Sequence, residues 1–274
     1  MSENLKLICL DVDGTLVGAS REVHPRVWDA AAKARAAGLH LAICTGRPAM
    51  GQTREFAETL DNQGWHIFQG GASLLNLASG KTLSRLLPAE PLQALLSQRE
   101  RFGWVLELYS DTDYVCDQVL DQSEAARLAV AHAELLALPY KTRAFESLQG
   151  EIVRTQWVVT EAMLPDVLAA APEGVLYASA TSPSVPGVHF VSVTAPQTDK
   201  CDAIRRLATE ILGCGLAQTM MVGDGQNDIS AMQMVGWPVA MGNGDPALKA
   251  VCRYHVGDVA EGGAAEAIEM ALGL

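Results

Sequence analysis

Residues 7–16 have the sequence LICLDVDGTL, in which a short apolar run leads directly into Asp11 and Asp13. An apolar run of this length is typical of a buried strand, and α/β sheets bind their ligands at the carboxyl ends of such strands. Two carboxylates held this close repel each other unless they share a proton or a cation. The pair therefore suits Mg²⁺ binding or a nucleophilic aspartate. The alternative is a strand that ends in an ordinary turn, where Asp and Gly are common.

Strands and helices alternate on either side of this stretch over the first 80 residues. The expected strands cover residues 5–10, 39–44 and 65–68, and the expected helices cover residues 25–37 and 48–60. Pro25 at the start and Gly38 after the end mark the first helix. Such alternation predicts parallel strands joined by helical crossovers.

The middle of the chain lacks this alternation. Its expected elements are a hairpin at 72–77 and 82–86, a helix at 92–101, paired strands at 104–109 and 113–116, strands at 152–160, 175–180 and 188–193, and a helix near 163–170. From about residue 199 the alternation resumes, with helices at 200–212, 227–234, 246–251 and 263–272 and strands at 219–222 and 239–241. We therefore predict an α/β frame from residues 1–80 and 190–274, interrupted by an α+β domain at 81–189.

Composition restricts the partners and the compartment. The 274 residues are enough for one large or two medium domains. A net charge of −12 argues against nucleic acid and anionic membranes as partners, and a phosphorylated substrate would have to meet local positive charge or a metal. The six cysteines show no C-x-x-C pair, a reduced, intracellular pattern. With no secretory signal or membrane-spanning apolar run, we expect a cytoplasmic protein.

Two further clusters fall where predicted strands end or helices begin. Thr45, Gly46 and Arg47 follow the second strand, where a hydroxyl and backbone N–H groups can cradle an anion. They could equally be a helix cap and a turn. Lys200 stands at a helix start, where the helix dipole disfavours a cation unless it faces an anion such as phosphate. A solvated surface lysine is the alternative.

The sequence MMVGDGQND at residues 220–228 predicts another strand that runs into an acidic loop. Its two glycines allow a sharp turn that brings Asp224 and Asp228 near a common point. Asp224 would then be a metal ligand, Asp228 would position the metal or Lys200, and Asn227 could donate to a phosphate oxygen. The alternative is an Asx-rich turn that caps the next helix.

Taken in order, Asp-x-Asp-Gly-Thr, Thr-Gly-Arg, the lysine and Gly-Asp-Gly-x-Asn-Asp resemble the motifs of the haloacid dehalogenase (HAD) superfamily. The long insert is similar to the large α/β cap, type IIB, of Cof-like sugar phosphatases. The resemblance implies a Rossmann-like, doubly wound core with an inserted cap domain. Two departures stand out: Gly70-Gly71-Ala72 replaces the usual Asn-Gly-Ala, and Cys201 replaces a usual Gly. The first puts substrate contacts near the cap hinge in doubt.

The resemblance also implies a Mg²⁺-dependent phosphatase of small phosphomonoesters, sugar phosphates foremost. Asp11 would attack phosphorus to give an aspartyl-phosphate, and Asp13 would protonate the leaving oxygen and then activate water. The ion would be held by Asp11, Asp224 and the backbone carbonyl of Asp13. Phosphoryl oxygens would be bound by Thr45, Gly46, Lys200 and Asn227, with Asp228 and Arg47 in support.

The sequence leaves the substrate specificity and the exact reaction open. Glu107, Tyr109 and Asp113 lie at a strand end and turn of the insert and could meet sugar hydroxyls, or form an ordinary hairpin with a polar tip. A phosphomutase or a glycosyl-phosphoglycerate phosphatase would share every motif. A catalytically silent binder of phosphate ligands is the third possibility, although a binder needs no nucleophile. We expect a monomer or small homo-oligomer whose partner is a small phosphorylated metabolite.

Overall fold

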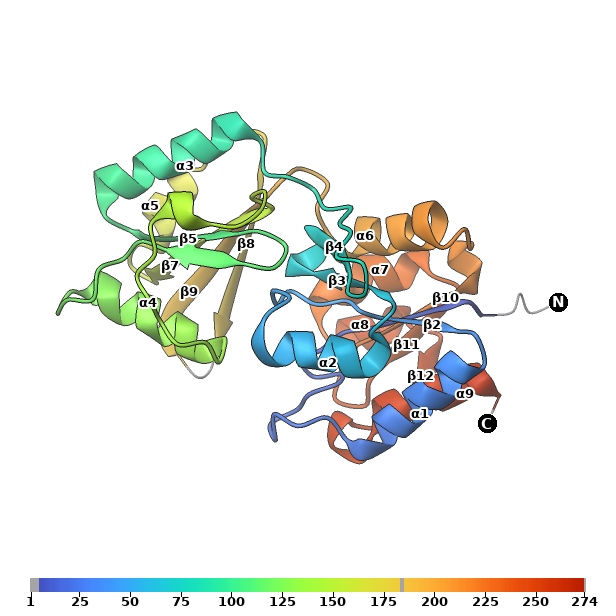
Figure 1. Cartoon of the computed structure of the whole chain (residues 1–274). Helices are drawn as coiled ribbons and strands as arrows, with labels where there is room; N and C mark the ends of the chain where they lie inside the picture. Colours follow the sequence, from blue (N-terminus) through green and yellow to red (C-terminus); the bar gives the residue numbers. More distant parts are fainter. Residues whose placement is uncertain (1–4, 183–184, 274) are drawn as a thin grey trace. The chain divides into compact units, whose positions relative to one another are not determined.

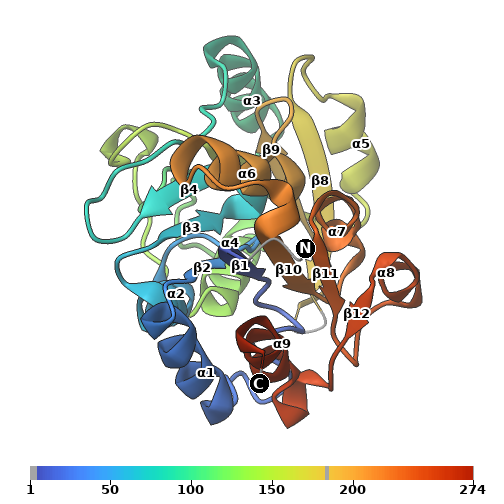
Figure 2. The ribbon, with the colours of Figure 1, turned by 90° about the vertical axis from the view of Figure 1, so that its right-hand side faces the viewer.

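The computed structural model describes residues 5–182 and 185–273 (Figures 1 and 2). The chain divides into two compact units: a core unit, made of the chain up to Arg47, Thr53–Leu83 and the chain from Asp199 onward, and an inserted unit, made of Pro48–Gln52 and Ser84–Thr198. The predicted insert spanned residues 81–189. Its observed end lies later because a strand of the inserted unit continues to Thr194.

The core unit is built mostly from short, buried strands and the helices that connect them. Its elements in chain order are β1 (Leu7–Leu10), α1 (Pro25–Ala36), β2 (His40–Ile43), β3 (Trp65–Phe68), η1 (Gln69–Gly71), β4 (Ser73–Asn76), α6 (Lys200–Arg206), η3 (Leu207–Ile211), η4 (Leu216–Gln218), β10 (Thr219–Gly223), η5 (Gln226–Asp228), α7 (Ile229–Met234), β11 (Trp237–Ala240), α8 (Pro246–Val251), β12 (Tyr254–His255), η6 (Val259–Glu261) and α9 (Gly263–Leu272). Helix α2 (Gly51–Asp61) begins in the short segment assigned to the inserted unit and continues in the core unit.

The core sheet is fully parallel, with strand order β12-β11-β10-β1-β2. The chain leaves β1 for β2 on one side and later returns to place β10 on the other side. The strand order therefore reverses at β1, and a parallel sheet of this kind binds ligands at the carboxyl ends of the strands beside such a reversal. The residues that follow β1 and β10 are those of the two acidic motifs.

Helices cover both faces of this sheet. Leu7 and Cys9 of β1 and Met221 of β10 belong to an apolar cluster with residues of α6, α7 and α8. Helices α1 and α9 lie side by side on the opposite face (Figure 2). All four residues of β1 are buried, as expected of a parallel strand covered on both faces. The predicted doubly wound α/β core is confirmed.

The edge of the core sheet beyond β2 differs from the prediction. The expected hairpin partner at 82–86 does not form a strand, since β4 pairs antiparallel with β3 and Thr82 makes only an isolated bridge to Leu75. Strand β3 is joined to β2 partly by a side chain: the Ile43 N–H donates to His66 Nδ1 over 3.1 Å. His66 Nε2 lies 2.8 Å from the Asp61 carbonyl oxygen. Burial lowers the pKa of His66 to about 4, so its ring is neutral and able to accept.

The inserted unit is an antiparallel sheet with helices on both faces. Its elements are α3 (Ala89–Phe102), β5 (Val105–Tyr109), β6 (Tyr114–Cys116), α4 (Glu124–Leu135), η2 (Phe145–Ser147), β7 (Arg154–Thr160), α5 (Leu164–Ala169), β8 (Leu176–Ser182) and β9 (Val185–Thr194), with strand order β6-β5-β7-β9-β8. Helices α3 and α5 lie on one face and α4 on the other (Figure 1). Helix α4 was not predicted, although Ser123 caps it by accepting the Ala126 N–H.

The remaining sequence predictions concern the state of the cysteines and the presence of membrane-spanning helices. All six cysteines are free thiols. Burial raises the pKa of the Cys9 and Cys44 thiols well above the ordinary value, so both side chains serve as small apolar core residues. Across the described part of the chain, no helix combines the length and hydropathy of a membrane span.

Candidate active site

Asp11 stands one residue beyond β1 and is held by a buried lysine. Lys200 Nζ lies 2.8 Å from Asp11 Oδ1 and 2.7 Å from Asp228 Oδ1, and all three side chains are almost completely buried. Burial alone would lower the pKa of Lys200, but the carboxylates of Asp11 and Asp228 outweigh it and raise the pKa above its ordinary value. Lys200 is therefore a fixed positive charge inside the site, and not the solvated surface lysine that was the alternative.

The start of α6 places Lys200 in this position. Asp199 caps the helix, and its Oδ1 accepts the Asp202 N–H over 2.7 Å. Gly71 lies directly against this cap: a Cβ on Gly71 would come within 2.3 Å of the Asp199 carbonyl oxygen, and its φ is +105°. The second glycine of Gly70-Gly71-Ala72 is thus required for the close approach of η1 to the helix that carries the lysine.

Asp224 follows β10 and is held by the loop that follows β1. Thr15 Oγ1 donates to Asp224 Oδ1 over 3.1 Å, and a Cβ on Gly14 would lie 2.0 Å from Asp224 Oδ2. Asn243 Nδ2 in turn donates to the Gly14 carbonyl oxygen over 2.7 Å. Sequence analysis assigned no role to Thr15 or Asn243. Thr15 is the last residue of the Asp-x-Asp-Gly-Thr motif, and Asn243 closely follows a predicted strand, but neither signal predicts these contacts.

Asp11, Asp224 and Asp228 form an acidic cluster that suits a divalent cation. Each offers one carboxylate oxygen, and these oxygens lie within 4.8 Å of one another. Burial raises the pKa of Asp11 to about 7 against the opposing effect of Lys200, and it raises the pKa of Asp224 to about 6. A cation relieves this crowding of charge, and an all-oxygen ligand set is the kind that Mg²⁺ prefers. The residues fit the predicted ion, with Asp228 as an additional carboxylate near it.

Asp13 is not one of the three carboxylates of this cluster; its side chain is largely exposed to solvent and is paired with Arg47. Arg47 Nε donates to Asp13 Oδ2 over 2.9 Å, and Arg47 Nη2 donates to Asp13 Oδ1 over 2.5 Å. The Asp13 side chain keeps 64% of its surface exposed despite this pair. The predicted metal ligand at this position was the backbone carbonyl of Asp13, so the carboxylate is available for other chemistry.

The remaining residues predicted to bind phosphate follow β2 and β10 at the same edge of the sheet. Thr45 is fully buried, and its Oγ1 accepts the Arg47 N–H over 3.2 Å. Its own N–H donates to the Ile67 carbonyl oxygen, which fixes the turn against β3. Gly46 and Asn227 are exposed. The two motifs therefore present exposed polar groups beside the buried Asp11 and Lys200.

Two residues predicted to set specificity lie in the interior of the inserted unit. Glu107 and Tyr109 are adjacent on the face of β5 that α4 covers, and the Tyr109 hydroxyl donates to Glu107 Oε2 over 2.6 Å. His132 Nδ1 of α4 lies 2.8 Å from the same carboxylate. Gln156, the register partner of Glu107 on β7, donates to it over 3.3 Å. Their polar atoms are therefore bonded to one another within the unit.

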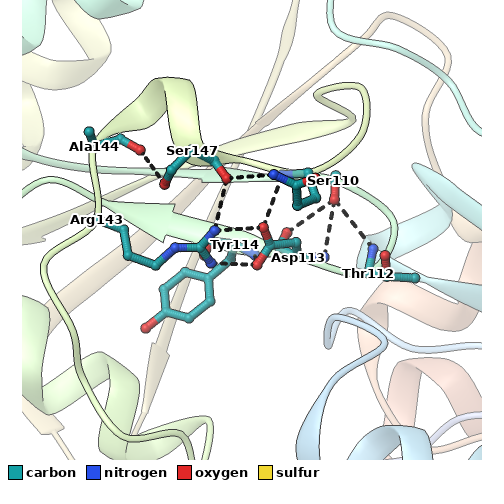
Figure 3. Close-up of polar contacts among 8 residues, drawn as sticks. Ser110, Thr112, Asp113, Tyr114, Arg143, Ala144 and Ser147 are labelled. Carbon is teal, nitrogen blue, oxygen red and sulfur yellow. Dashed lines mark hydrogen bonds and ion pairs between the residues drawn. The ribbon is translucent and has the colours of Figure 1, made fainter.

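Asp113, the third such residue, anchors the turn between β5 and β6 (Figure 3). Both of its carboxylate oxygens accept from the Arg143 guanidinium, over 2.6 and 3.0 Å, and the N–H groups of Tyr114 and Gln149 add further bonds. Partial burial alone would raise the pKa of Asp113, but these hydrogen bonds outweigh it and lower the pKa. The carboxylate thus ties the turn to the segment that follows α4.

Comparisons with known sequences cover nearly the whole chain. The sequence pattern of the haloacid dehalogenase-like hydrolases matches residues 8–268. A Streptococcus pyogenes serotype M6 protein provisionally named as a phosphatase, M6_Spy0533, is 28% identical over 275 residues, which cover 97% of each chain. The Bacillus subtilis 5-amino-6-(5-phospho-D-ribitylamino)uracil phosphatase YcsE is 24% identical over 267 residues, covering 97% of this chain and 95% of its own length.

A solved structure extends the similarity to the architecture of both units. The HAD subclass IIB sugar phosphatase BT4131 matches with a TM-score of 0.74 and 25% sequence identity, covering 97% of this chain and 98% of its own. That match agrees with the parallel core sheet and the additional antiparallel sheet described above. The predicted fold class is confirmed.

Proposed function

This chain belongs to the haloacid dehalogenase-like hydrolases, its named relatives are phosphatases, and on that premise we propose that it hydrolyses small phosphomonoesters through an aspartyl-phosphate on Asp11. One observation carries the proposal: Asp11 lies at the carboxyl end of β1 with its carboxylate 2.8 Å from the buried Lys200 ammonium. A nucleophile beside a fixed cation suits attack on an anionic phosphoryl group, because the cation offsets the repulsion between two negative groups.

In the first step an Asp11 oxygen forms a bond to phosphorus as the bond from phosphorus to the leaving oxygen breaks. Asp13 gives its carboxyl proton to that leaving oxygen. In the second step a water oxygen attacks phosphorus, its proton passes to Asp13, and the bond from phosphorus to Asp11 breaks. The products are an alcohol and inorganic phosphate, and both aspartates return to their starting states.

The other residues of the site would stabilise charge on the phosphoryl group or hold its ligands in position. Lys200 would stabilise the negative charge that spreads over the phosphoryl oxygens, and Thr45, Gly46 and Asn227 would donate to those oxygens. Asp11, Asp224 and Asp228 would hold Mg²⁺, which supplies further positive charge to the phosphoryl group when bound. Thr15 and Asn243 hold Asp224 and Gly14 in place for that purpose.

Phosphorylated sugars and polyols are the substrate class that we propose. Support comes from the similarity to a protein of solved structure that is named as a sugar phosphatase. A second relative is named for a substrate that carries its phosphate on a ribityl chain. Both names describe phosphate esters of polyhydroxylated alcohols, whose alkoxides need a proton to leave, and an acid such as Asp13 supplies one.

A phosphate-release screen with Mg²⁺ tests this proposal. The panel contains hexose and pentose phosphates, sugar-alcohol phosphates, nucleotides and phosphoglycolate, and product analysis follows each active substrate. We expect release of inorganic phosphate, fastest with sugar or sugar-alcohol phosphates. Phosphate moved within the substrate without release would identify a mutase. Tight binding without turnover of any compound would identify a silent binder, and either result would contradict the proposal.

A further inference from the structure

Arg47 makes a contact that has no role in the reaction steps proposed above. Its guanidinium meets the Asp13 carboxylate with two nitrogens, one on each oxygen, over 2.9 and 2.5 Å. Such a two-point contact fixes the plane of a carboxylate, whereas a single hydrogen bond leaves it free to rotate. Asp13 is 64% exposed and Arg47 31% exposed, so burial by neighbouring side chains does not hold this carboxylate in place.

Backbone contacts hold both ends of this pair. The Arg47 N–H donates to Thr45 Oγ1 over 3.2 Å, and the Arg47 carbonyl oxygen accepts the Gln69 N–H over 2.9 Å. Asp13 is held by a backbone bridge to Val17. The pair therefore links two fixed loops, one after β1 and one after β2, and sets the direction of the Asp13 carboxyl group.

We propose that Arg47 is a positioning residue for Asp13: it orients the carboxyl group that exchanges protons with the leaving oxygen and with water. The proposal rests on the proposed function. Arg47 itself exchanges no proton and forms no bond to phosphorus. It acts through orientation, because proton transfer requires the carboxyl oxygen to lie within hydrogen-bond reach of the reacting oxygen, and small displacements of such groups cost rate steeply.

The pair is compatible with proton transfer by Asp13. Each carboxylate oxygen has two lone pairs, and one hydrogen bond from Arg47 occupies only one of them. The other lone pair can carry the proton that passes to the leaving oxygen.

The alternative role for Arg47 is direct contact with the substrate, and leaving-group dependence separates the two roles. A sugar phosphate releases an alkoxide, which needs a proton, whereas p-nitrophenyl phosphate releases a stable phenolate, which does not. The experiment measures kcat and KM of the wild type, Arg47→Ala, Arg47→Lys, Asp13→Asn and the double variant Arg47→Ala/Asp13→Asn. The substrates are p-nitrophenyl phosphate and the alkyl phosphate that the screen identifies as best.

We expect Arg47→Ala to lower kcat about 10- to 100-fold on the alkyl phosphate and less than about threefold on p-nitrophenyl phosphate. Asp13→Asn should show the same ordering with a larger effect, and the double variant should lose nothing beyond Asp13→Asn, since the two residues act as one unit. Arg47→Lys should recover only part of kcat, because an ammonium cannot make the two-point contact. Equal losses on both substrates, or a change in KM alone, would overturn the proposal.

Arg54→Ala is the matched control for deleting an arginine. Arg54 pairs with Glu58 on the exposed surface of α2, and its removal should leave both kcat values unchanged.

The same experiment distinguishes failure of the phosphatase proposal from failure of the role proposed for Arg47. A wild type that hydrolyses neither substrate overturns the phosphatase proposal and this inference together. A wild type that hydrolyses both, with Arg47→Ala equally slow on each, overturns only the role of Arg47.

Discussion

At the residue scale, the site depends on two glycines that let carboxylates come close to the backbone. A Cβ on Gly14 would lie 2.0 Å from Asp224 Oδ2, and a Cβ on Gly223 would lie 2.5 Å from Asp228 Oδ2. Gly14 also has a φ of +76°, which favours glycine over every other residue. The acidic cluster can therefore form only where these two positions lack a side chain.

Substituting Gly14 by alanine tests this requirement. The new methyl group displaces the Asp224 carboxylate, and we expect Mg²⁺ affinity and kcat each to fall about 100-fold. The free energy of unfolding should also fall by about 1–3 kcal/mol because of the backbone strain. Titration calorimetry with Mg²⁺ and steady-state kinetics measure the effects.

Gly38→Ala is the matched control for the strain alone. Gly38 has a φ of +83°, and a Cβ there would meet nothing within 4 Å. This variant should lose similar stability but keep full Mg²⁺ affinity and activity. Equal loss of affinity in the two variants would show that strain, and not displacement of Asp224, is the cause.

At the element scale, the connection between β2 and β3 depends on the neutral form of His66. Its pKa is lowered to about 4 in the folded chain, against about 6.5 for an unfolded histidine. Between these two values the unfolded chain binds more protons than the folded one. The contribution of His66 to stability is therefore complete above pH 6.5 and is lost as the pH falls toward 4.

His66→Gln removes this titration while keeping an acceptor and a donor on the side chain. We expect the stability difference between the wild type and the variant to shrink by about 3 kcal/mol from pH 7 to pH 4. Urea unfolding at several pH values measures it. His40→Gln, which changes an exposed histidine of β2, is the matched control. A wild type and a His66→Gln variant with parallel pH profiles would refute the assignment.

In the inserted unit, α4 is fastened to the sheet by the polar contact between His132 and Glu107, 2.8 Å apart and buried. Removing one partner leaves the other buried with fewer bonds, so His132→Ala should cost about 2–4 kcal/mol of unfolding free energy. Asp117→Ala breaks the more exposed pair of Asp117 with Arg99 and should cost less than about 1 kcal/mol. Urea unfolding compares the two, and equal costs would argue against a buried anchor.

Sequence patterns predicted most of the core elements because apolar runs and glycine breaks mark them directly. Helices α8 and α9 begin and end at the predicted residues. Helix α4 was missed, and with it the reason why Glu107 faces inward: alternation along β5 shows that a residue lies on one face of a sheet but not which helix covers that face.

Sequence analysis predicted only those site residues that stand in recognisable motifs. Asp11, Lys200, Asp224 and Asp228 stand in recognisable patterns, and the structure brings these four side chains together. The hydrogen bond from Thr15 to Asp224 joins residues 209 positions apart, and no local sequence pattern predicts it. Contacts of this kind depend on the order of the strands in the sheet, which only the fold supplies.

At the scale of the whole molecule, the net charge opposes long-range attraction of a phosphorylated substrate. The chain has a net charge of −12, and the positive groups of the site, Lys200 and Arg47, are each paired with carboxylates. A phosphorylated substrate is therefore repelled at a distance and attracted only within the site.

This distribution predicts an unusual response to salt. Raising KCl from about 20 to about 200 mM screens the repulsion, so kcat/KM for a sugar phosphate at saturating Mg²⁺ should stay level or rise by less than about threefold. Choline chloride in place of KCl separates a specific effect of K⁺ from screening. A fall of more than about tenfold in kcat/KM would mean that an attractive field steers the substrate, contrary to this account.

The central claim is that Asp11 is the nucleophile, and turnover by Asp11→Asn tests it most directly. The amide keeps the shape of the side chain but cannot form the aspartyl-phosphate. We predict that kcat with the best sugar phosphate and saturating Mg²⁺ falls at least about 1000-fold, while Asp29→Asn, an exposed change on α1, keeps full activity. A folded, Mg²⁺-loaded Asp11→Asn protein with kcat within about tenfold of the wild type would contradict the account.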